Sequence, residues 1–291
     1  MANPILRKQL ENGEMVVAPG AYDAITARLF RYLGFGALAV PGSQTGMVLG
    51  TTEPLTTLTQ MAMVGENVVK GVRGELPVIL DAGAGFGDPV HVMNTVEVLE
   101  DAGISAIHIE DQVFPKRVSY HRGLEHVVPI DVYQQRIEYA LKARKSKDFI
   151  IIARNDGYRA VEGGTREDAV KRAHAAMEVG ADVIMPMGSK SVEDLHYFRQ
   201  EIKNVPLAYL PVPGAFEVPE MKEQGWQIVI YPSATLTAAI KGIYHEFKHV
   251  KDTGYLLQTP VAETQEFRDL TNILMNMEEK MEVEAATTEG Q

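Results

Sequence analysis

The stretch Ala106–Asp111 reads AIHIED, a mostly apolar run that ends in two acidic residues. It is one of eight short apolar runs, and stretches with apolar residues at helical spacing lie between them. The eight runs are Met15–Ala18, Ala37–Val40, Pro77–Asp81, Ala106–Asp111, Phe149–Asn155, Asp182–Met187, Pro206–Leu210 and Gln227–Tyr231. Apolar strands separated by helices of about ten or more residues predict a parallel sheet buried on both faces.

Eight strand-helix units in roughly 240 residues indicate an α/β protein with a (β/α)8 barrel of the TIM type. An open doubly wound sheet is the alternative, because the number of strands cannot show that the sheet closes. We expect the barrel to occupy residues 1–258 and to carry the functional residues where strands end and the following loops begin.

A further helix is predicted over Val261–Val283, after Thr259-Pro260 ends the eighth unit. Phe267, Leu270 and Leu274 lie on one stripe of this helix, and no barrel strand follows it. The stripe therefore needs another surface, and we expect a partner subunit in a homo-oligomer to supply it. The predicted organisation is a helical extension over residues 259–283 and a disordered tail over residues 284–291.

Composition restricts the classes of partner. The 291 residues are 45% hydrophobic, include no cysteine and carry a formal net charge of −11. Such an acidic chain argues against a nucleic acid or an anionic membrane as the main partner. No apolar run reaches the roughly 18 residues of a membrane span, and no signal peptide is indicated. The absence of cysteine fits a cytoplasmic protein, which is our expectation.

Polar residues at the predicted strand ends are the candidate site. Asp81 and Glu110 end neighbouring strands, and paired carboxylates suit Mg²⁺ or Mn²⁺. The alternative is that each acid pairs with a basic residue or caps a helix. Arg154 follows a buried apolar run and must meet an anion, either a substrate carboxylate or an internal partner such as Asp156 or Glu110. The loop at Gly42-Ser43 could hold a carboxylate with its amides, or could only form a turn.

Three motifs resemble the isocitrate lyase and phosphoenolpyruvate mutase superfamily, particularly its methylisocitrate lyase-like members. They are DAGAGFG at residues 81–87, HIEDQVFPKR at residues 108–117 and IIARND at residues 151–156. The resemblance spans residues of roughly 5 to 255 in the order expected for a barrel. It implies a Mg²⁺-dependent enzyme that acts on 2-oxo or 2-hydroxy carboxylates through an enolate.

The resemblance also implies a role for each matching residue. Asp81 and Glu110 match carboxylates of the metal site, and Arg154 matches the arginine that binds the substrate carboxylate. Lys116 matches a lysine on a gating loop. The substrate-binding loop corresponds to Gly42, Ser43 and the adjoining Gln44. The superfamily exchanges a C-terminal helix between subunits, which implies a dimer or tetramer.

Several positions depart from the superfamily pattern. The lyases carry a proton-donating cysteine two residues after the gating lysine, where this chain has Val118. Gly83 replaces the second acid of a D-x-D metal motif. Met187 replaces a glutamate after the sixth strand, and Tyr209 stands where an asparagine is expected on the seventh.

Three functions remain open. The favoured one is a Mg²⁺-dependent lyase that cleaves a C–C bond of a small 2-hydroxy or 2-oxo acid, with Tyr120 or His121 as proton donor. The second is a hydrolase, decarboxylase or phosphonomutase that uses Ser119 on an oxaloacetate- or phosphonopyruvate-like substrate. The third is a catalytically inactive barrel that binds a ligand.

Overall fold

A computed structural model describes residues 3–118, 121, 123–211 and 218–288. The chain forms two compact units, Met1–Thr235 and Leu236–Gln291. The first unit contains all eight strands in the described part of the chain.

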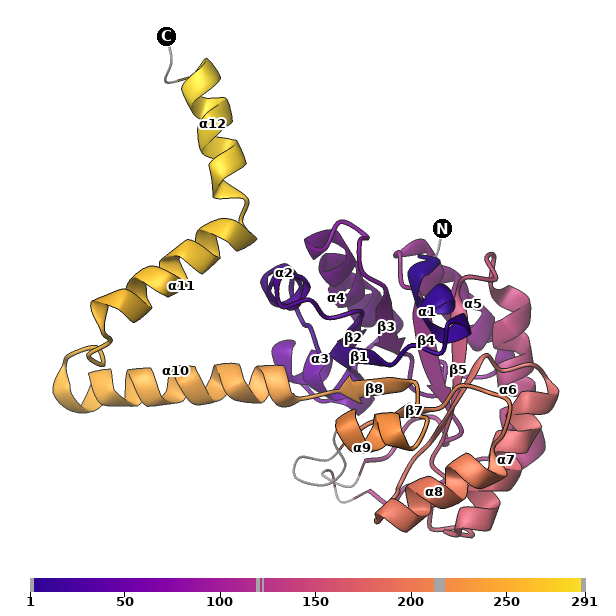
Figure 1. Cartoon of the computed structure of the whole chain (residues 1–291). Coiled ribbons are helices and arrows are strands. Elements are labelled where there is room, and N and C mark those ends of the chain that lie inside the picture. Colours follow the sequence, from indigo (N-terminus) through magenta and orange to yellow (C-terminus); the bar gives the residue numbers. More distant parts are fainter. Residues whose placement is uncertain (1–2, 119–120, 122, 212–217, 289–291) are drawn as a thin grey trace. The chain divides into compact units, whose positions relative to one another are not determined.

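The strands of the first unit form a closed ring (Figure 1). They are β1 (Val16–Pro19), β2 (Leu38–Val40), β3 (Val78–Asp81), β4 (Ala106–Glu110), β5 (Ile150–Asn155), β6 (Val183–Pro186), β7 (Ala208–Tyr209) and β8 (Ile228–Tyr231). Parallel pairing joins β2 to β6 in chain order, and joins β1 to β8 and β8 to β7. Parallel bridges Gly20–Ala39 and Ile184–Leu207 connect these two sheets. The ring closes, so the barrel prediction is confirmed over the open sheet.

Helices surround the ring and connect consecutive strands (Figure 1). They are α2 (Ala24–Tyr32), α4 (Leu58–Gly71), α5 (Pro89–Asp101), α6 (Ile130–Ala143), α7 (Arg166–Glu178), α8 (Val192–Glu201) and α9 (Val218–Glu223). The short α3 (Gly42–Val48) and the 3₁₀ turn η1 (Glu53–Leu55) lie between β2 and α4. Asp23, Thr57 and Thr165 start helices by accepting a backbone N–H of the first turn.

The strands separate two apolar layers because successive side chains point to opposite faces. Leu80 and Ile107 pack outward against the helices, together with Leu99 of α5. Ile79, Ala106 and Ile152 belong to the inner cluster, and Leu6 of the N-terminal α1 (Ile5–Glu11) packs with them. The barrel is therefore a packed core and not a pore.

The second unit differs in detail from the prediction. The expected single helix over Val261–Val283 is wrong, because α11 (Val261–Leu274) ends before α12 (Met277–Thr287) begins. Asn276 has φ 50°, a left-handed conformation that interrupts the helix. α12 also includes residues 284–287, which we expected to be disordered. The preceding α10 (Ala234–Thr253) spans the boundary of the compact units at Thr235, whereas the predicted boundary lay at residue 258.

No described helix combines the length and low charge that a membrane span requires. The exchange of C-terminal helices between subunits stays a prediction.

Leu99→Ala tests the packing of α5 on the barrel. The Leu99 side chain is fully buried, so its truncation leaves a cavity between helix and strands. We expect the free energy of unfolding to fall by about 2–5 kcal/mol in urea titrations. Val90→Ala is the matched control, because Val90 lies on the same helix and is 73% exposed. Its effect should stay within about 0.5 kcal/mol, and equal losses for both variants would contradict the packing described.

Candidate active site

Strand register brings charged side chains together at the carboxyl end of the barrel. The pairing of β3 with β4 aligns Asp81 with His108, and that of β4 with β5 aligns Glu110 with Arg154. Each of these residues lies two or four positions beyond an inward-facing apolar residue on its own strand, so all four point into the barrel. All four are less than 8% exposed. The last layers of the barrel interior are therefore ionic where the layers below are apolar.

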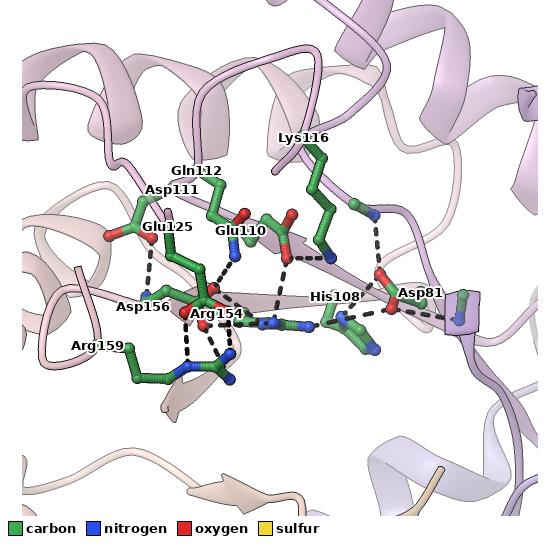
Figure 2. A network of polar contacts seen from close by, with 12 residues as sticks. Asp81, His108, Glu110, Asp111, Gln112, Lys116, Glu125, Arg154, Asp156 and Arg159 are labelled. Carbon is green, nitrogen blue, oxygen red and sulfur yellow. Dashed lines mark hydrogen bonds and ion pairs between the residues drawn. The ribbon is translucent and has the colours of Figure 1, made fainter. Parts of the chain in front are cut away.

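Arg154 lies at the centre of this ionic layer. Its Nε and Nη2 donate to the Asp156 carboxylate at 3.2 and 3.3 Å, and Nη2 lies 3.3 Å from Glu110 Oε2. Nη1 lies 4.0 Å from Asp81 Oδ2. Figure 2 shows the guanidinium between Asp156 and Asp81, with Glu110 beside it. The internal ion pairs anticipated as an alternative for Arg154 are present.

Lys116 joins the layer from the loop between β4 and α6. Its Nζ donates at 3.0 Å to Glu110 Oε2 (Figure 2) and also donates to Glu53. Glu53, on η1, was not among the predicted site residues, although it follows the Gly42 loop in the chain. A Cβ at Gly42 would lie 2.8 Å from Glu53 Cγ and 3.0 Å from Asp81 Oδ2. Glycine is therefore required here for these two carboxylates to approach the loop.

Negative charge exceeds positive charge in this cluster. Four carboxylates, those of the half-buried Glu53 and the buried Asp81, Glu110 and Asp156, face two cations, Lys116 and Arg154. Arg159 also approaches Asp156, at 3.6 Å, but it pairs with Glu125. The cluster is left with two formal negative charges. A bound cation would neutralise them.

Burial and the neighbouring charges shift the ionisation of the cluster. Burial raises the pKa of Glu110 to about 7, against the opposing charges of Lys116 and Arg154. The pKa of Asp81 lies well below its usual range. Burial alone would raise it, but electrostatic attraction by His108, Lys116 and Arg154 outweighs that effect. Burial lowers the pKa of His108 to about 4, so its imidazole is neutral at pH 7.

A cavity of about 180 Å³ lies against this cluster. Its charged and polar lining comes from the β2–β5 ends and the loops that follow them, and includes Ser43, Glu53, Asp81, His108, Gln112, Lys116, Glu125, Arg154 and Arg159. Its apolar lining includes Val118, Met187, Leu210, Ile230 and Pro232. The cavity therefore has a charged wall and an apolar wall.

The predicted loop residues have different positions. Ser43 lines the cavity, whereas the Gly42 N–H donates to Asp81 Oδ2 at 3.3 Å. Gln44 is fully buried, lies close to Gly20 and is not part of the cavity lining. Of these three predicted substrate-binding residues, Ser43 has the placement that a substrate contact requires.

The proposed proton donors are only partly described. Ser119 and Tyr120 lie outside the described residues, and His121 is exposed and does not line the cavity. Val118 does line it and is 5% exposed. The methyl groups of Val118 thus line the cavity at the position where the resemblance places the cysteine of the superfamily lyases.

Tyr209, which stands where the resemblance places an asparagine on the seventh strand, does not face the cavity. It points outward, and its ring packs edge-on against Trp226 at 5.7 Å between centroids. Leu210, the next residue, lines the cavity. Side chains alternate along a strand, so neighbouring residues lie on opposite faces. Leu210 is therefore the residue at this strand end that meets a bound ligand.

Asp111 belongs to a separate network behind the barrel wall. Its Oδ2 pairs with Arg172 of α7 at 3.2 Å, and its Oδ1 accepts the Asp156 N–H at 2.8 Å. Burial and the charge of Asp156 raise the pKa of Asp111 to about 7. Arg136 of α6 donates to the Glu110 carbonyl and, at 3.0 Å, to that of Gln112. The two acids of AIHIED thus differ in role, since Glu110 pairs with Lys116 and Arg154 inside the barrel and Asp111 fixes the strand end to the helices.

The residues present fit a divalent cation. The Glu110 Oε1 atom is buried without a hydrogen bond, and the carboxylates of the cluster outnumber its cations by two. No group of three or more acidic or histidine side chains in the described residues has metal-binding geometry. Mg²⁺ is commonly bound through one or two carboxylates, with water and substrate oxygens as further ligands. Asp81 and one neighbouring carboxylate, that of Glu110 or Glu53, could supply such a pair. Gly83 offers only a backbone N–H, which donates to Asp81 Oδ1 at 2.9 Å.

Arg172→Ala tests the network that supports the site. Arg172 is 6% exposed, and its removal leaves the Asp111 carboxylate buried without its cation. We expect the free energy of unfolding to fall by about 3–5 kcal/mol in urea titrations. Arg31→Ala is the matched control, because the Arg31–Glu75 pair is exposed and should contribute less than about 1 kcal/mol. A loss for Arg172→Ala no larger than that of the control would show that Asp111 does not depend on this pair.

Comparison with known proteins agrees with this geometry. A family model described as phosphoenolpyruvate phosphomutase matches residues 6–251. The 2-methylisocitrate lyase of Aeropyrum pernix is 37% identical over 254 residues, which cover 86% of this chain and 80% of the relative. The 2,3-dimethylmalate lyase of Eubacterium barkeri is 34% identical over 287 residues, 96% of each chain.

Solved structures show the same similarity. A crystal structure of 2,3-dimethylmalate lyase has a TM-score of 0.83 at 32% identity, covering 98% of this chain and 99% of that one. A phosphonopyruvate hydrolase in complex with oxalate and Mg²⁺ has a TM-score of 0.83 at 26% identity, covering 99% of both chains. The chain belongs to the phosphoenolpyruvate mutase and isocitrate lyase superfamily.

Proposed function

We propose that this protein is a Mg²⁺-dependent lyase that cleaves a C–C bond of a small 2-hydroxy or 2-oxo carboxylic acid through an enolate. The observation that carries the proposal is the cavity at the barrel mouth, where Arg154 and Lys116 meet buried carboxylates that exceed them in charge. Relatives named as lyases of 2-methylisocitrate and 2,3-dimethylmalate support this reaction type.

Arg154 and Ser43 would bind the substrate carboxylate. Both line the cavity, and the guanidinium can present two parallel N–H donors to a carboxylate. Asp156 already holds one side of the guanidinium and so fixes its plane. A substrate would therefore meet a donor that is already oriented, which reduces the entropy lost on binding.

Asp81, with Glu110 or Glu53 as a second carboxylate, would hold the Mg²⁺. When bound, the metal would polarise the substrate carbonyl and stabilise negative charge on the enolate oxygen. Lys116 donates to two of these carboxylates and so keeps them close together from a loop that also lines the cavity.

The proton that quenches the enolate needs a donor other than a thiol. Val118 has no transferable proton, and we propose that Tyr120 or His121 on the same loop supplies it. Tyr120→Phe and His121→Ala should then separate the candidates, because only loss of the donor lowers kcat without changing the affinity for oxalate.

Turnover of a substrate panel tests the reaction. Purified protein with Mg²⁺ would be incubated with 2-hydroxy and 2-oxo acids, and pyruvate, glyoxylate and CO₂ would be measured. We expect release of a 2-oxo acid product in the presence of Mg²⁺ and its loss with EDTA. Phosphate release from phosphonopyruvate would instead support a hydrolase, and no turnover of any compound would support the inactive barrel.

Asp81→Asn tests the metal site through the binding of a ligand, without any measurement of turnover. Oxalate is the probe, since a related structure contains oxalate with Mg²⁺. Calorimetry should show Mg²⁺-dependent oxalate binding to the wild type and its loss in Asp81→Asn, because the amide oxygen lacks the charge that Mg²⁺ requires. Asp101→Asn is the control, since Asp101 pairs with Lys145 at an exposed site. Binding that survives in Asp81→Asn would overturn this assignment.

Arg154→Ala tests the carboxylate contact. We expect KM to rise at least about tenfold, since a charge-assisted bidentate contact contributes a few kcal/mol of binding. Arg154→Lys should recover only part of the loss, because an ammonium cannot present the planar pair of donors. Lys145→Ala removes an exposed charge outside the cavity lining and should leave KM unchanged. Thermal unfolding of each variant separates loss of binding from loss of fold.

A further inference from the structure

The apolar wall of the cavity has no role in the mechanism above. It is built by Val118 of the β4–α6 loop, Met187 after β6, Leu210 after β7 and Ile230 of β8. In the described part of the chain, the β6–β8 ends contribute no charged side chain to the cavity lining. Two of these residues, Val118 and Met187, stand where the superfamily pattern has a polar group. The wall is thus apolar at several independent positions.

The cation nearest to this wall is already neutralised. Arg159 follows β5 and pairs with Glu125 through Nε at 2.7 Å and through Nη2 (Figure 2). Its Nη1 lies 3.6 Å from Asp156 Oδ1. Backbone contact reinforces this pair, since the Val161 N–H donates to the Glu125 carbonyl at 3.0 Å. A ligand carboxylate on this side would have to displace Glu125 from Arg159.

We infer that the substrate presents an alkyl substituent, and not a second carboxylate, to the wall formed by Val118, Met187 and Leu210. An ionised group placed there loses its water and gains no hydrogen bond from the wall, whereas an alkyl group removes apolar surface from water. This inference rests on the proposed function, because Arg154 and the metal site must hold the carboxylate and the oxygens on which the enolate charge develops. The alkyl substituent is therefore carried by a part of the substrate that does not take up that charge. The inference adds the chemical class of the part of the substrate that Arg154 and the metal site do not hold.

The size of the cavity agrees with such a ligand. An apolar cavity of about 150 Å³ accommodates benzene, and this one measures about 180 Å³. A 2-oxo or 2-hydroxy carboxylate with a short alkyl chain has a similar number of heavy atoms. Larger polar acids would need the cavity to open.

Competition against oxalate on the wild-type protein tests the inference. Pyruvate, 2-oxobutyrate and 2-oxopentanoate would displace oxalate in the presence of Mg²⁺, with oxaloacetate and 2-oxoglutarate as the dicarboxylic counterparts. We expect affinity to rise about fourfold for each added methylene. Each alkyl acid should also bind more tightly than its dicarboxylic counterpart. Tighter binding of the diacids would overturn the inference and would indicate that Arg159 exchanges Glu125 for the ligand.

Variants of the wall provide a second readout. Met187→Gln and Leu210→Asn place polar groups in the wall and should abolish the gain per methylene. Tyr209→Phe is the matched control, because Tyr209 adjoins Leu210 but packs outside the barrel, so the preference among acids should not change. An unchanged alkyl preference in both wall variants would refute the assignment of this surface.

The two proposals fail in different ways. If no Mg²⁺-dependent binding of oxalate or of any 2-oxo acid occurs, the proposed function falls and the alkyl subsite falls with it. If oxalate binds with Mg²⁺ but chain length has no effect, only the alkyl subsite is refuted.

Discussion

The buried guanidinium of Arg154 is the interaction on which the rest of the site depends. It stands among three carboxylates, those of Asp81, Glu110 and Asp156, within 4.0 Å of each. Carboxylates this close repel one another strongly in a region shielded from water. Without a cation between them, they could share the barrel mouth only by binding protons. Arg154 and Lys116 allow several of them to remain close together, yet leave enough negative charge to attract a metal ion.

Burying these charges does not increase the free energy of unfolding of the protein. Ion pairs removed from water regain at most part of the lost hydration, and well-packed apolar residues in their place are often as stable. The strand positions directly below, at Ile79 and Ile152, show that this barrel fills its interior with apolar side chains elsewhere. The retention of a charged layer only at the carboxyl end supports a ligand-binding role for that end, as in other barrels of this type.

The sequence predicted the fold because eight apolar runs and their spacing are local properties, and closure follows from packing both faces of a parallel sheet. It also predicted that Asp81, Glu110 and Arg154 would meet, since strand ends converge at one edge of the barrel. It could not predict which side chains face inward where a strand ends irregularly, as at Tyr209 and Leu210. Pairs between separate loops, such as Glu125 with Arg159, have no local signal at all.

The departures from the superfamily pattern are not scattered over the site. Asp81, Lys116 and Arg154 keep the charged part of the cavity lining, whereas the changes at Val118 and Met187 add apolar side chains to that lining. Random loss of function would remove charged residues as readily as other polar ones, and would leave buried charges without partners. Two apolar replacements from separate segments that line one cavity instead favour a changed second half of the substrate. An enzyme that keeps its reaction but accepts a different substrate retains the residues that hold the reacting group and changes those that contact the rest of the substrate. The charged and the apolar lining of this cavity follow that division.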